Sequence, residues 1–187
     1  MAGALAGTIV LELTRVSPSG FCTMILADMG ADVLKIEPPP ALSPESGAGM
    51  SAGAERQAAF SYVNRNKRSL GLNLKTPEGL SILHRLAAQA DVLVEGFRPG
   101  VMQRLNADYA TLSRLNPRLV YCSLSGFGQN GPYRGFPAHD LNYLAISGVL
   151  HLIGEAGRPP AIPLNIIADY GGAALHGVVG ILLALYA

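Results

Sequence analysis

Charged side chains are scarce in this sequence. Only 14% of its 187 residues are Asp, Glu, Lys or Arg, whereas 49% are hydrophobic, which is apolar even for a globular protein. We therefore expect part of the surface to be covered by another subunit or by a further segment. The formal net charge of +1 lacks the basic excess of proteins that bind nucleic acids or anionic membranes, so neither partner is expected.

Cysteine is scarce as well. Cys22 and Cys122 lie in apolar stretches, and two cysteines are too few for a disulfide scaffold, so we expect buried thiols in a reducing compartment. Residues Met1–Gly7 lack the basic start and long apolar stretch of a signal peptide. The apolar segment Gly171–Ala187 is shorter than a membrane-spanning helix. We interpret it as a buried core helix, cut off without a cap.

Predicted strands and helices alternate along the chain. The strands are Ile9–Leu13, Asp32–Ile36, Leu70–Leu74, Val92–Glu95 and Leu119–Leu124. The helices are Phe21–Met29 after a turn at Pro18–Gly20, one capped by Thr76 with Pro77 at its first position, and Tyr109–Leu115. Residues 38–59 are rich in Pro, Gly, Ser and Ala and are expected to form a loop. The alternation predicts an α/β fold: a Rossmann-like open parallel sheet with helices on both faces.

The glycines of a dinucleotide-binding fingerprint are missing. Glu37 ends the second predicted strand, where such folds place the acid that holds a ribose. The first turn contains Ser17–Gly20 instead of three spaced glycines, so a pyrophosphate has no close approach to the backbone. The sequence therefore argues against nicotinamide binding of that type.

Two short motifs contain candidates for proton transfer. His139 and Asp140 stand together, and Asp169 follows about thirty positions later, just before Gly171 and Gly172. A histidine and an aspartate are the groups needed to move a proton on a carbon next to a carbonyl. The alternatives are that His139 is an ordinary polar loop residue and that each aspartate is a helix N-cap. We interpret Asp140 as such a cap, for the helix that follows it.

Two basic stretches are candidates for phosphate binding. Asn64–Ser69 leads into a predicted strand, and Gly96–Arg104 passes from a loop into a helical turn with two arginines and an aromatic ring. Guanidinium groups grip phosphate, and an adenine packs against apolar side chains. The alternative is that both are solvated basic turns.

Many further motifs occur in the order typical of one family. They are Gly7–Leu13, Leu26–Val33, Asn64–Ser69, Leu72–Lys75, Asp91–Glu95, Pro117–Tyr121 and Ser125–Pro132. Over essentially its whole length the chain resembles the family III CoA-transferases. Within that family it is most similar to the racemases of 2-methylacyl-CoA, through Gly126–Gly128, Ala138–Tyr143, Pro163–Asn165 and Ala168-Asp169.

The resemblance implies an architecture larger than this chain. Family members are about twice as long and have a Rossmann-like large domain, a smaller second domain and an interlocked homodimer. Residues 1–187 would then be the truncated CoA-binding large domain, without the second domain. No metal and no permanently bound cofactor are implied; coenzyme A enters as part of the acyl-CoA substrate.

The resemblance also implies a chemistry and a site. His139 and Asp169 would exchange the α-proton, with an enolate as the intermediate. If a helix began at Gly171 and Gly172, the backbone N–H groups there would stabilise the negative charge of that enolate. The residues expected to contact CoA are Lys35, Arg65, Arg68, Leu72, Gly96, Phe97, Arg98, Met102 and Arg104. Two family features are missing: an arginine just after the second strand, where Pro38 and Pro39 stand, and a glutamate that supports the histidine.

Two alternatives remain open at this point. In the CoA-transferases of the family the aspartate at the place of Asp169 is a nucleophile that forms an aspartyl-CoA thioester. The other alternative is an inactive CoA-binding fragment or paralogue. The expected location is the cytoplasm, or the peroxisome or mitochondrion in a eukaryote.

Overall fold

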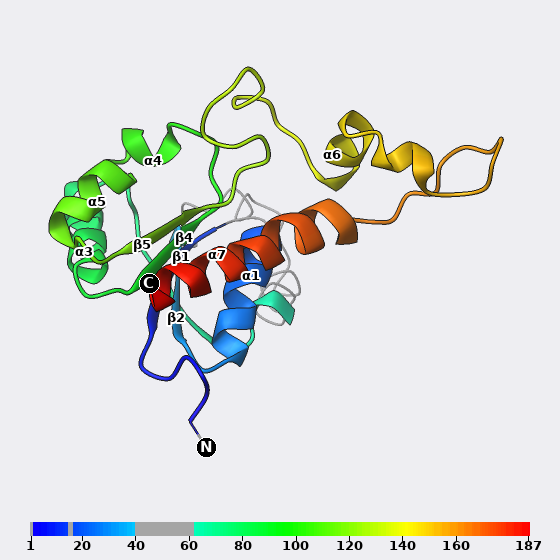
Figure 1. Ribbon diagram of the computed structural model, residues 1–187. Coiled ribbons are helices and arrows are strands. Elements are labelled where there is room, and N and C mark those ends of the chain that lie inside the picture. The colour runs from blue at the N-terminus through cyan, green and yellow to red at the C-terminus, as the bar shows by residue number, and fades with distance from the viewer. Residues whose placement is uncertain (1, 15–16, 40–61) are drawn as a thin grey trace.

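A parallel sheet of five strands forms the centre of the molecule (Figure 1). The computed structural model describes residues 2–14, 17–39 and 62–187. The strands are β1 (Ile9–Leu13), β2 (Asp32–Glu37), β3 (Lys67–Gly71), β4 (Val92–Glu95) and β5 (Val120–Ser123), in the order β3-β2-β1-β4-β5. This confirms the predicted α/β class and the Rossmann-like parallel sheet. The strand order reverses at β1, because β2 and β3 lie on one side of it and β4 and β5 on the other. Open α/β sheets bind ligands outside the carboxyl ends of the strands at such a point.

Helices cover both faces of the sheet, as predicted. The α-helices are α1 (Ser17–Asp28), α3 (Pro77–Ala87), α4 (Val101–Arg104), α5 (Tyr109–Leu115), α6 (Asp140–Ile146) and α7 (Leu175–Tyr186). Short turns η3 (Tyr62–Asn64) and η4 (Val149–Leu152) are 3₁₀-helical, and η5 (Ile166–Ala174) is π-helical and runs directly into α7. Figure 1 shows α3 and α5 on one face and α1 and α7 on the other.

The period of two along the strands divides the core into two layers. On β1, Val10 packs on the side of α1 and α7, whereas Leu11 and Leu13 pack on the side of α3 and α5. On β4, Val92 and Val94 face the first layer and the residue between them faces the second. Strands buried on both faces are typical of a parallel sheet between helices, and they explain why these segments are almost wholly apolar.

Two elements start several residues earlier than predicted, whereas the other boundary differences of the predicted strands and helices are of a single residue. The helix α1 starts at Ser17, so Pro18–Gly20 form its first turn and not a separate turn; proline is well tolerated there because the first N–H groups of a helix have no partner within it. The strand β3 covers Lys67–Gly71 and not Leu70–Leu74. Leu72 leaves the sheet to pack in the core, after its N–H donates a last bond to the Glu37 carbonyl.

The carboxyl-terminal helix is buried on one side only. The prediction of a fully buried core helix is wrong: Val178 and Ile181 are buried against the sheet, whereas Val179, Leu182 and Leu183 are exposed. By length and apolar composition, the helical run of 21 residues from 166 to 186 is also sufficient to cross a membrane. Here it lies along the sheet, with contacts to α1 and β5.

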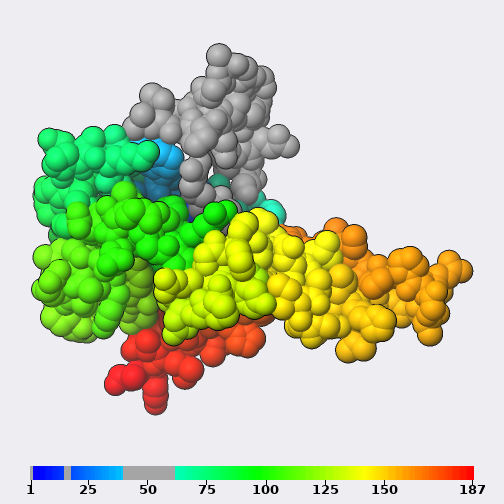
Figure 2. Space-filling view, turned by 90° about the horizontal axis from the view of Figure 1, so that it is seen from above, coloured from blue at the N-terminus to red at the C-terminus, as the bar shows by residue number. Residues whose placement is uncertain are grey.

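A segment between β5 and η5 projects from the body of the molecule. Figures 1 and 2 show α6 and the residues after it extending away from the sheet. Its exposed apolar side chains include Ile146, Leu152, Ile162 and Leu164. The projecting arm, residues 140–165, therefore presents apolar surface on a thin extension, and α6 at its start contacts η5, which follows its end.

Candidate active site

The two proton-transfer candidates meet where the projecting arm leaves and rejoins the body. His139 is the residue before α6, and Asp169 lies in the first part of η5. The Nδ1 atom of His139 is 3.9 Å from Oδ2 of Asp169, with side-chain exposures of 76% and 8%. This distance is too long for a hydrogen bond, but it brings together two groups separated by thirty positions in the sequence.

Asp140 makes a contact that the sequence analysis did not foresee. It is the first residue of α6 and not its N-cap, which is His139. Its Oδ2 accepts hydrogen bonds from the backbone N–H of Ala168, at 2.7 Å, and of Asp169, at 2.9 Å. The local sequence could indicate a cap, but it contains no signal for a partner 28 residues away.

The helix start expected at Gly171 and Gly172 is also wrong. The helix begins at Ile166, so both glycines lie in its interior. A π-helix pairs each N–H with the carbonyl five residues earlier, and these glycines are therefore not free donors at a helix end. Their assigned role in holding enolate charge is withdrawn.

Burial and a neighbouring carboxylate perturb Asp169. Desolvation raises the pKa of its carboxyl group above the ordinary value, and the negative charge of Asp140 raises it further; His139 and the backbone N–H of Asp140 act in the opposite direction. Both raising effects disfavour the charged form. The carboxyl group is thereby moved toward the range in which it can donate as well as accept a proton.

The loop after β5 fixes the approach to His139. The hydroxyl group of Tyr143 donates to the Ala138 carbonyl at 2.8 Å, and the same hydroxyl lies against Gly126. A β-carbon on Gly126 would come within 1.8 Å of it. The Ser125–Gly128 segment therefore packs closely against α6, and a larger residue at position 126 would displace the Tyr143 ring.

The basic residues predicted to bind phosphate fall into two separate groups. Arg65 pairs with Asp28 at the end of α1, and Arg68 pairs with Asp32 at the start of β2. Both lie toward the amino ends of the strands. Lys35 contacts Asn64 and Glu37. These three residues thus have ion-pair or hydrogen-bond partners on or near the surface, apart from the second basic stretch, and their contact with CoA stays a prediction.

The second basic stretch follows the carboxyl end of β4. Arg98 and Arg104 are exposed there, Gly96 and Phe97 are partly buried, and Met102 is in the core. Leu72 is likewise in the core. Of the nine residues expected to contact CoA, Arg98 and Arg104 are thus the exposed cations at the edge of the sheet where open α/β folds bind ligands.

A buried polar network lies beneath this edge. Glu95, the last residue of β4, accepts hydrogen bonds from the Phe97 N–H at 2.7 Å and from the Ser123 hydroxyl. Gln129 donates in turn to the hydroxyls of Ser123 and Ser125. Burial raises the pKa of Glu95. This network ties the carboxyl ends of β4 and β5 to the loop that contacts α6.

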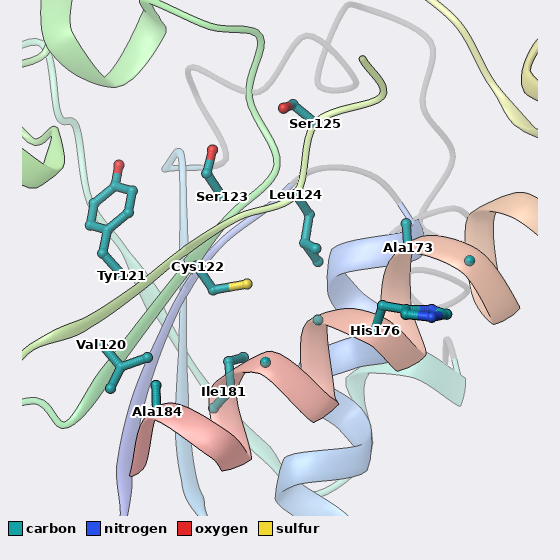
Figure 3. Close-up of a pocket in the computed structure, with 13 residues that line it drawn as sticks. Val120, Tyr121, Cys122, Ser123, Leu124, Ser125, Ala173, His176, Ile181 and Ala184 are labelled. Atoms are coloured by element: carbon teal, nitrogen blue, oxygen red, sulfur yellow. The ribbon is translucent and has the colours of Figure 1, made fainter. Parts of the chain in front are cut away.

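A cavity of about 520 Å³ lies elsewhere, between β5 and α7 (Figure 3). Its walls are residues 120–125 of the strand and its extension, and small residues of η5 and α7 such as Ala173, Gly177 and Gly180. His176 borders it, with Nδ1 3.3 Å from the Gly171 carbonyl. Neither His139 nor Asp169 lines this cavity, so we do not assign the chemistry to it.

Cysteine and metal chemistry have little support in the described part of the chain. Cys22 and Cys122 are both free thiols; Cys22 is buried, as predicted, whereas Cys122 is only partly buried. Burial raises the pKa of Cys122 to about 11 and that of Cys22 further still. Within residues 2–14, 17–39 and 62–187, no three His, Cys, Asp or Glu side chains gather as a metal site would require.

A model of CoA-transferase family III matches residues 5–187. The chain belongs to this family. Among curated relatives, the human alpha-methylacyl-CoA racemase is 44% identical over 183 residues, covering 98% of this chain and 44% of its own length. The acetyl-CoA:oxalate CoA-transferase of Acetobacter aceti is 41% identical, covering 99% of this chain and 47% of its own. The chain therefore spans less than half the length of these relatives.

Solved structures give the same family. A CAIB/BAIF family protein from Brucella suis superposes with a TM-score of 0.82 at 34% identity, covering 100% of this chain and 50% of its own. A hypothetical protein from Mycobacterium tuberculosis superposes with a TM-score of 0.83 at 31% identity, covering 100% of this chain and 52% of its own. Members of this family are enzymes that act on CoA thioesters.

Proposed function

We propose that the protein containing this chain is a racemase that interconverts (R)- and (S)-2-methylacyl-CoA thioesters by 1,1-proton transfer. The observation that carries the proposal is the 3.9 Å approach of His139 Nδ1 to Asp169 Oδ2. A racemase needs two groups that each exchange a proton, one for each face of the α-carbon. A transferase uses the carboxylate as a nucleophile, a role that does not require a second group exchanging protons at the α-carbon.

In the proposed reaction, one member of the pair accepts a proton from the substrate and the other member gives one back. Neutral His139 accepts the α-proton, and the electron pair of the broken C–H bond moves into the thioester as an enolate. Protonated Asp169 then gives its proton to the opposite face, which forms the new C–H bond. The pair is left as imidazolium and carboxylate, the state that catalyses the reverse direction. The raised pKa of Asp169 supports its part as the acid.

The pair must open to admit a substrate. Acid and base on opposite faces of one carbon, each about 3–3.5 Å from it, stand roughly 6–7 Å apart. The observed 3.9 Å is shorter. Because the His139 side chain is exposed and Asp169 is buried, we expect the histidine to move.

Hydrogen exchange separates the two reactions. A single enantiomer of a 2-methylacyl-CoA in D₂O should incorporate deuterium at the α-carbon and racemise, without added metal or nicotinamide. The same protein should be given a free carboxylic acid, such as oxalate or glutarate, as acceptor. Transfer of CoA without α-deuterium would overturn the racemase and identify Asp169 as a nucleophile, the activity that the names of relatives such as acetyl-CoA:oxalate CoA-transferase describe.

We also propose a homodimer whose contacts include the projecting arm. The arm carries exposed apolar side chains over residues 140–165 (Figure 2), and isolated extensions of this kind are stabilised by a partner surface. CoA binding through Arg98 and Arg104, and a location in the cytoplasm, complete the proposal.

A further inference from the structure

We propose that Asp140 is a positioning residue for the reaction: its carboxylate holds the backbone that carries Asp169 in register with the helix start that carries His139. This inference rests on the proposed function, since it concerns the same pair. Asp140 itself is not a catalytic residue, because its bonds go to the backbone of Ala168 and Asp169.

The connection between the two catalytic groups is otherwise long. The chain that joins α6 to η5 runs through the projecting arm, whose side chains are mostly exposed (Figure 1). The backbone from His139 to Asp169 therefore does not by itself fix their separation. The side chain of Asp140 connects the two groups directly. Asp140 is the residue after His139, and its carboxylate accepts a hydrogen bond from the N–H of Asp169.

The two bonds go to groups that need a partner. Ala168 and Asp169 are the third and fourth residues of η5, and the first four N–H groups of a helix have no acceptor within it. A carboxylate accepts such bonds more strongly than a neutral group, and its charge suits the positive end of the helix. Asp140 thus caps, from another segment of the chain, the helix that presents Asp169.

The burial of Asp140 indicates more than a surface cap. Its side chain is 2% exposed, and its Oδ1 atom has no hydrogen-bond partner among the described residues. Placing a half-satisfied carboxylate in a buried position is unfavourable for stability. The arrangement acts on Asp169 in two ways, by holding its backbone and by placing a like charge beside its carboxyl group.

Variants of Asp140 can separate these two effects. Asp140→Asn keeps an oxygen that can accept from Ala168 and Asp169 but removes the charge. Asp140→Ala removes both. A matched control is Asp91→Asn, because Asp91 also accepts a backbone N–H, from Ile9 at 2.8 Å, at the amino end of the sheet and away from the site. Each variant is made in the longest chain that the gene encodes.

The groups near Asp169 define what a pH profile reports. His139, Asp140 and Tyr143 lie around the start of α6 and interact with Asp169. Beyond Asp169 in the chain, Tyr170 stacks on Phe21 of α1, and His176 of α7 contacts the Gly171 carbonyl. Of these, Asp140 is the carboxylate that raises the pKa of Asp169. Removing the charge of Asp140 should lower the pKa of Asp169. The acid limb of the pH–rate profile should then move to lower pH for the enantiomer whose α-proton Asp169 removes.

The experiment measures kcat, KM and α-deuterium incorporation for both enantiomers. We expect Asp140→Ala to lower kcat by about tenfold or more, with KM within about twofold, because small displacements of a reacting group have effects of this size. Asp140→Asn should recover most of kcat and show the shifted acid limb, and Asp91→Asn should match the wild type.

The outcomes that overturn the inference are distinct from a failure of the proposed function. Absence of α-deuterium exchange in the wild-type protein contradicts the racemase itself. Exchange in the wild type overturns the role of Asp140 if Asp140→Ala is fully active, if the Ala and Asn variants lose equal activity, or if only KM changes. Where the Ala variant does not fold, an unshifted acid limb in Asp140→Asn is sufficient to overturn it.

Discussion

His139 and Asp169 differ in how firmly the structure holds each of them. The imidazole is 76% exposed, whereas the carboxyl group is 8% exposed and its backbone is fixed by Asp140. The aspartate is thus the stationary member of the pair and the histidine the adjustable one. A stationary acid on one face and a movable base on the other give the two faces of a substrate unequal environments.

This inequality predicts different effects for the two alanine variants. His139→Ala should most strongly reduce proton abstraction from one enantiomer, and Asp169→Ala abstraction from the other. Loss of a general acid or base lowers a rate by about 10²–10⁴-fold. The measurement is the initial rate of α-proton exchange for each enantiomer separately. Losses of roughly threefold or less in both variants would assign both residues a structural role.

The raised pKa of Asp169 predicts a pH-dependent effect on stability. A carboxyl group whose folded pKa is raised binds its proton more tightly in the native state. Its stabilising contribution is therefore present at low pH and lost as the pH rises through the folded pKa. We expect Asp169→Asn to raise the melting temperature at neutral pH, because it removes a buried charge next to Asp140.

The pH range in which the higher melting temperature of Asp169→Asn should disappear follows from the same pKa. As the pH falls through the raised pKa of Asp169 toward the unfolded value of about 3.9, the wild-type carboxyl group becomes neutral and the difference from Asp169→Asn should shrink. Thermal melting across this range checks the sign. A gain that grows toward acid pH would contradict the prediction, and Asp91→Asn serves as the control for removal of an aspartate outside the site.

At the scale of elements, a buried ion pair links strands that are not neighbours. Lys67, at the start of β3, reaches across β2 to Glu12 on β1, with Nζ 2.7 Å from Oε2. The same ammonium group donates to the carbonyl of Gly20 and to the hydroxyl of Thr23 on α1. The side chains of Lys67 and Glu12 are 2% and 1% exposed. These contacts fasten two strands and a helix around one charge pair.

Removal of one partner should cost far more than removal of both. Lys67→Met leaves the Glu12 carboxylate buried without its cation, which costs about 3–5 kcal/mol in comparable sites. In the double variant Glu12→Gln/Lys67→Met neither charge remains, and much of the loss should be recovered. Equilibrium urea unfolding of the wild type, of the single variants Lys67→Met and Glu12→Gln, and of the double variant gives the coupling energy. A loss within about 0.5 kcal/mol for Lys67→Met, as at an ordinary surface position, would contradict this prediction.

The elements most dependent on local pattern were the ones predictable from the sequence. Ile9–Leu13, Val92–Glu95 and Tyr109–Leu115 have the predicted bounds, and Thr76 caps α3 by accepting the Gly79 N–H. Apolar runs and capping residues act within a few positions of themselves, and they therefore leave a signal in the local sequence. The strand β3 shows the limit, because Leu72 belongs to the core and not to the strand.

The sequence identified the candidate residues of the site but not the contacts between them. His139 and Asp169 were singled out, and the structure brings them together. The role of Asp140 was missed, because its acceptor bonds reach Ala168 and Asp169, and nothing in the local sequence separates such a contact from an ordinary cap. The two arginine clusters were expected at one ligand, whereas the parallel sheet separates Arg65 from Arg98 at opposite ends of its strands.

At the scale of the whole molecule, apolar surface remains exposed on α7 and on the projecting arm. The exposed large side chains of α7 are Leu175, Val179, Leu182, Leu183, Leu185 and Tyr186. Monomeric proteins seldom expose one apolar patch larger than roughly 300–600 Å². The other side of α7 is buried against the sheet. One face of the helix is thus covered, and the opposite face is open to a partner.

We therefore expect a polypeptide of residues 1–187 to associate with itself and to be inactive in α-proton exchange. Sedimentation velocity at about 50 µM, a concentration at which exposed apolar surface promotes association, should show species larger than the 19.6 kDa monomer. Leu182→Lys/Leu183→Lys should reduce this association, because it places two charges on the open face of α7. The matched control is Leu115→Lys, an exposed leucine on α5 at the opposite face of the sheet, which should leave association unchanged. A monomer that exchanges the α-proton as fast as the longest encoded chain would contradict the prediction, because the open face would then need no partner.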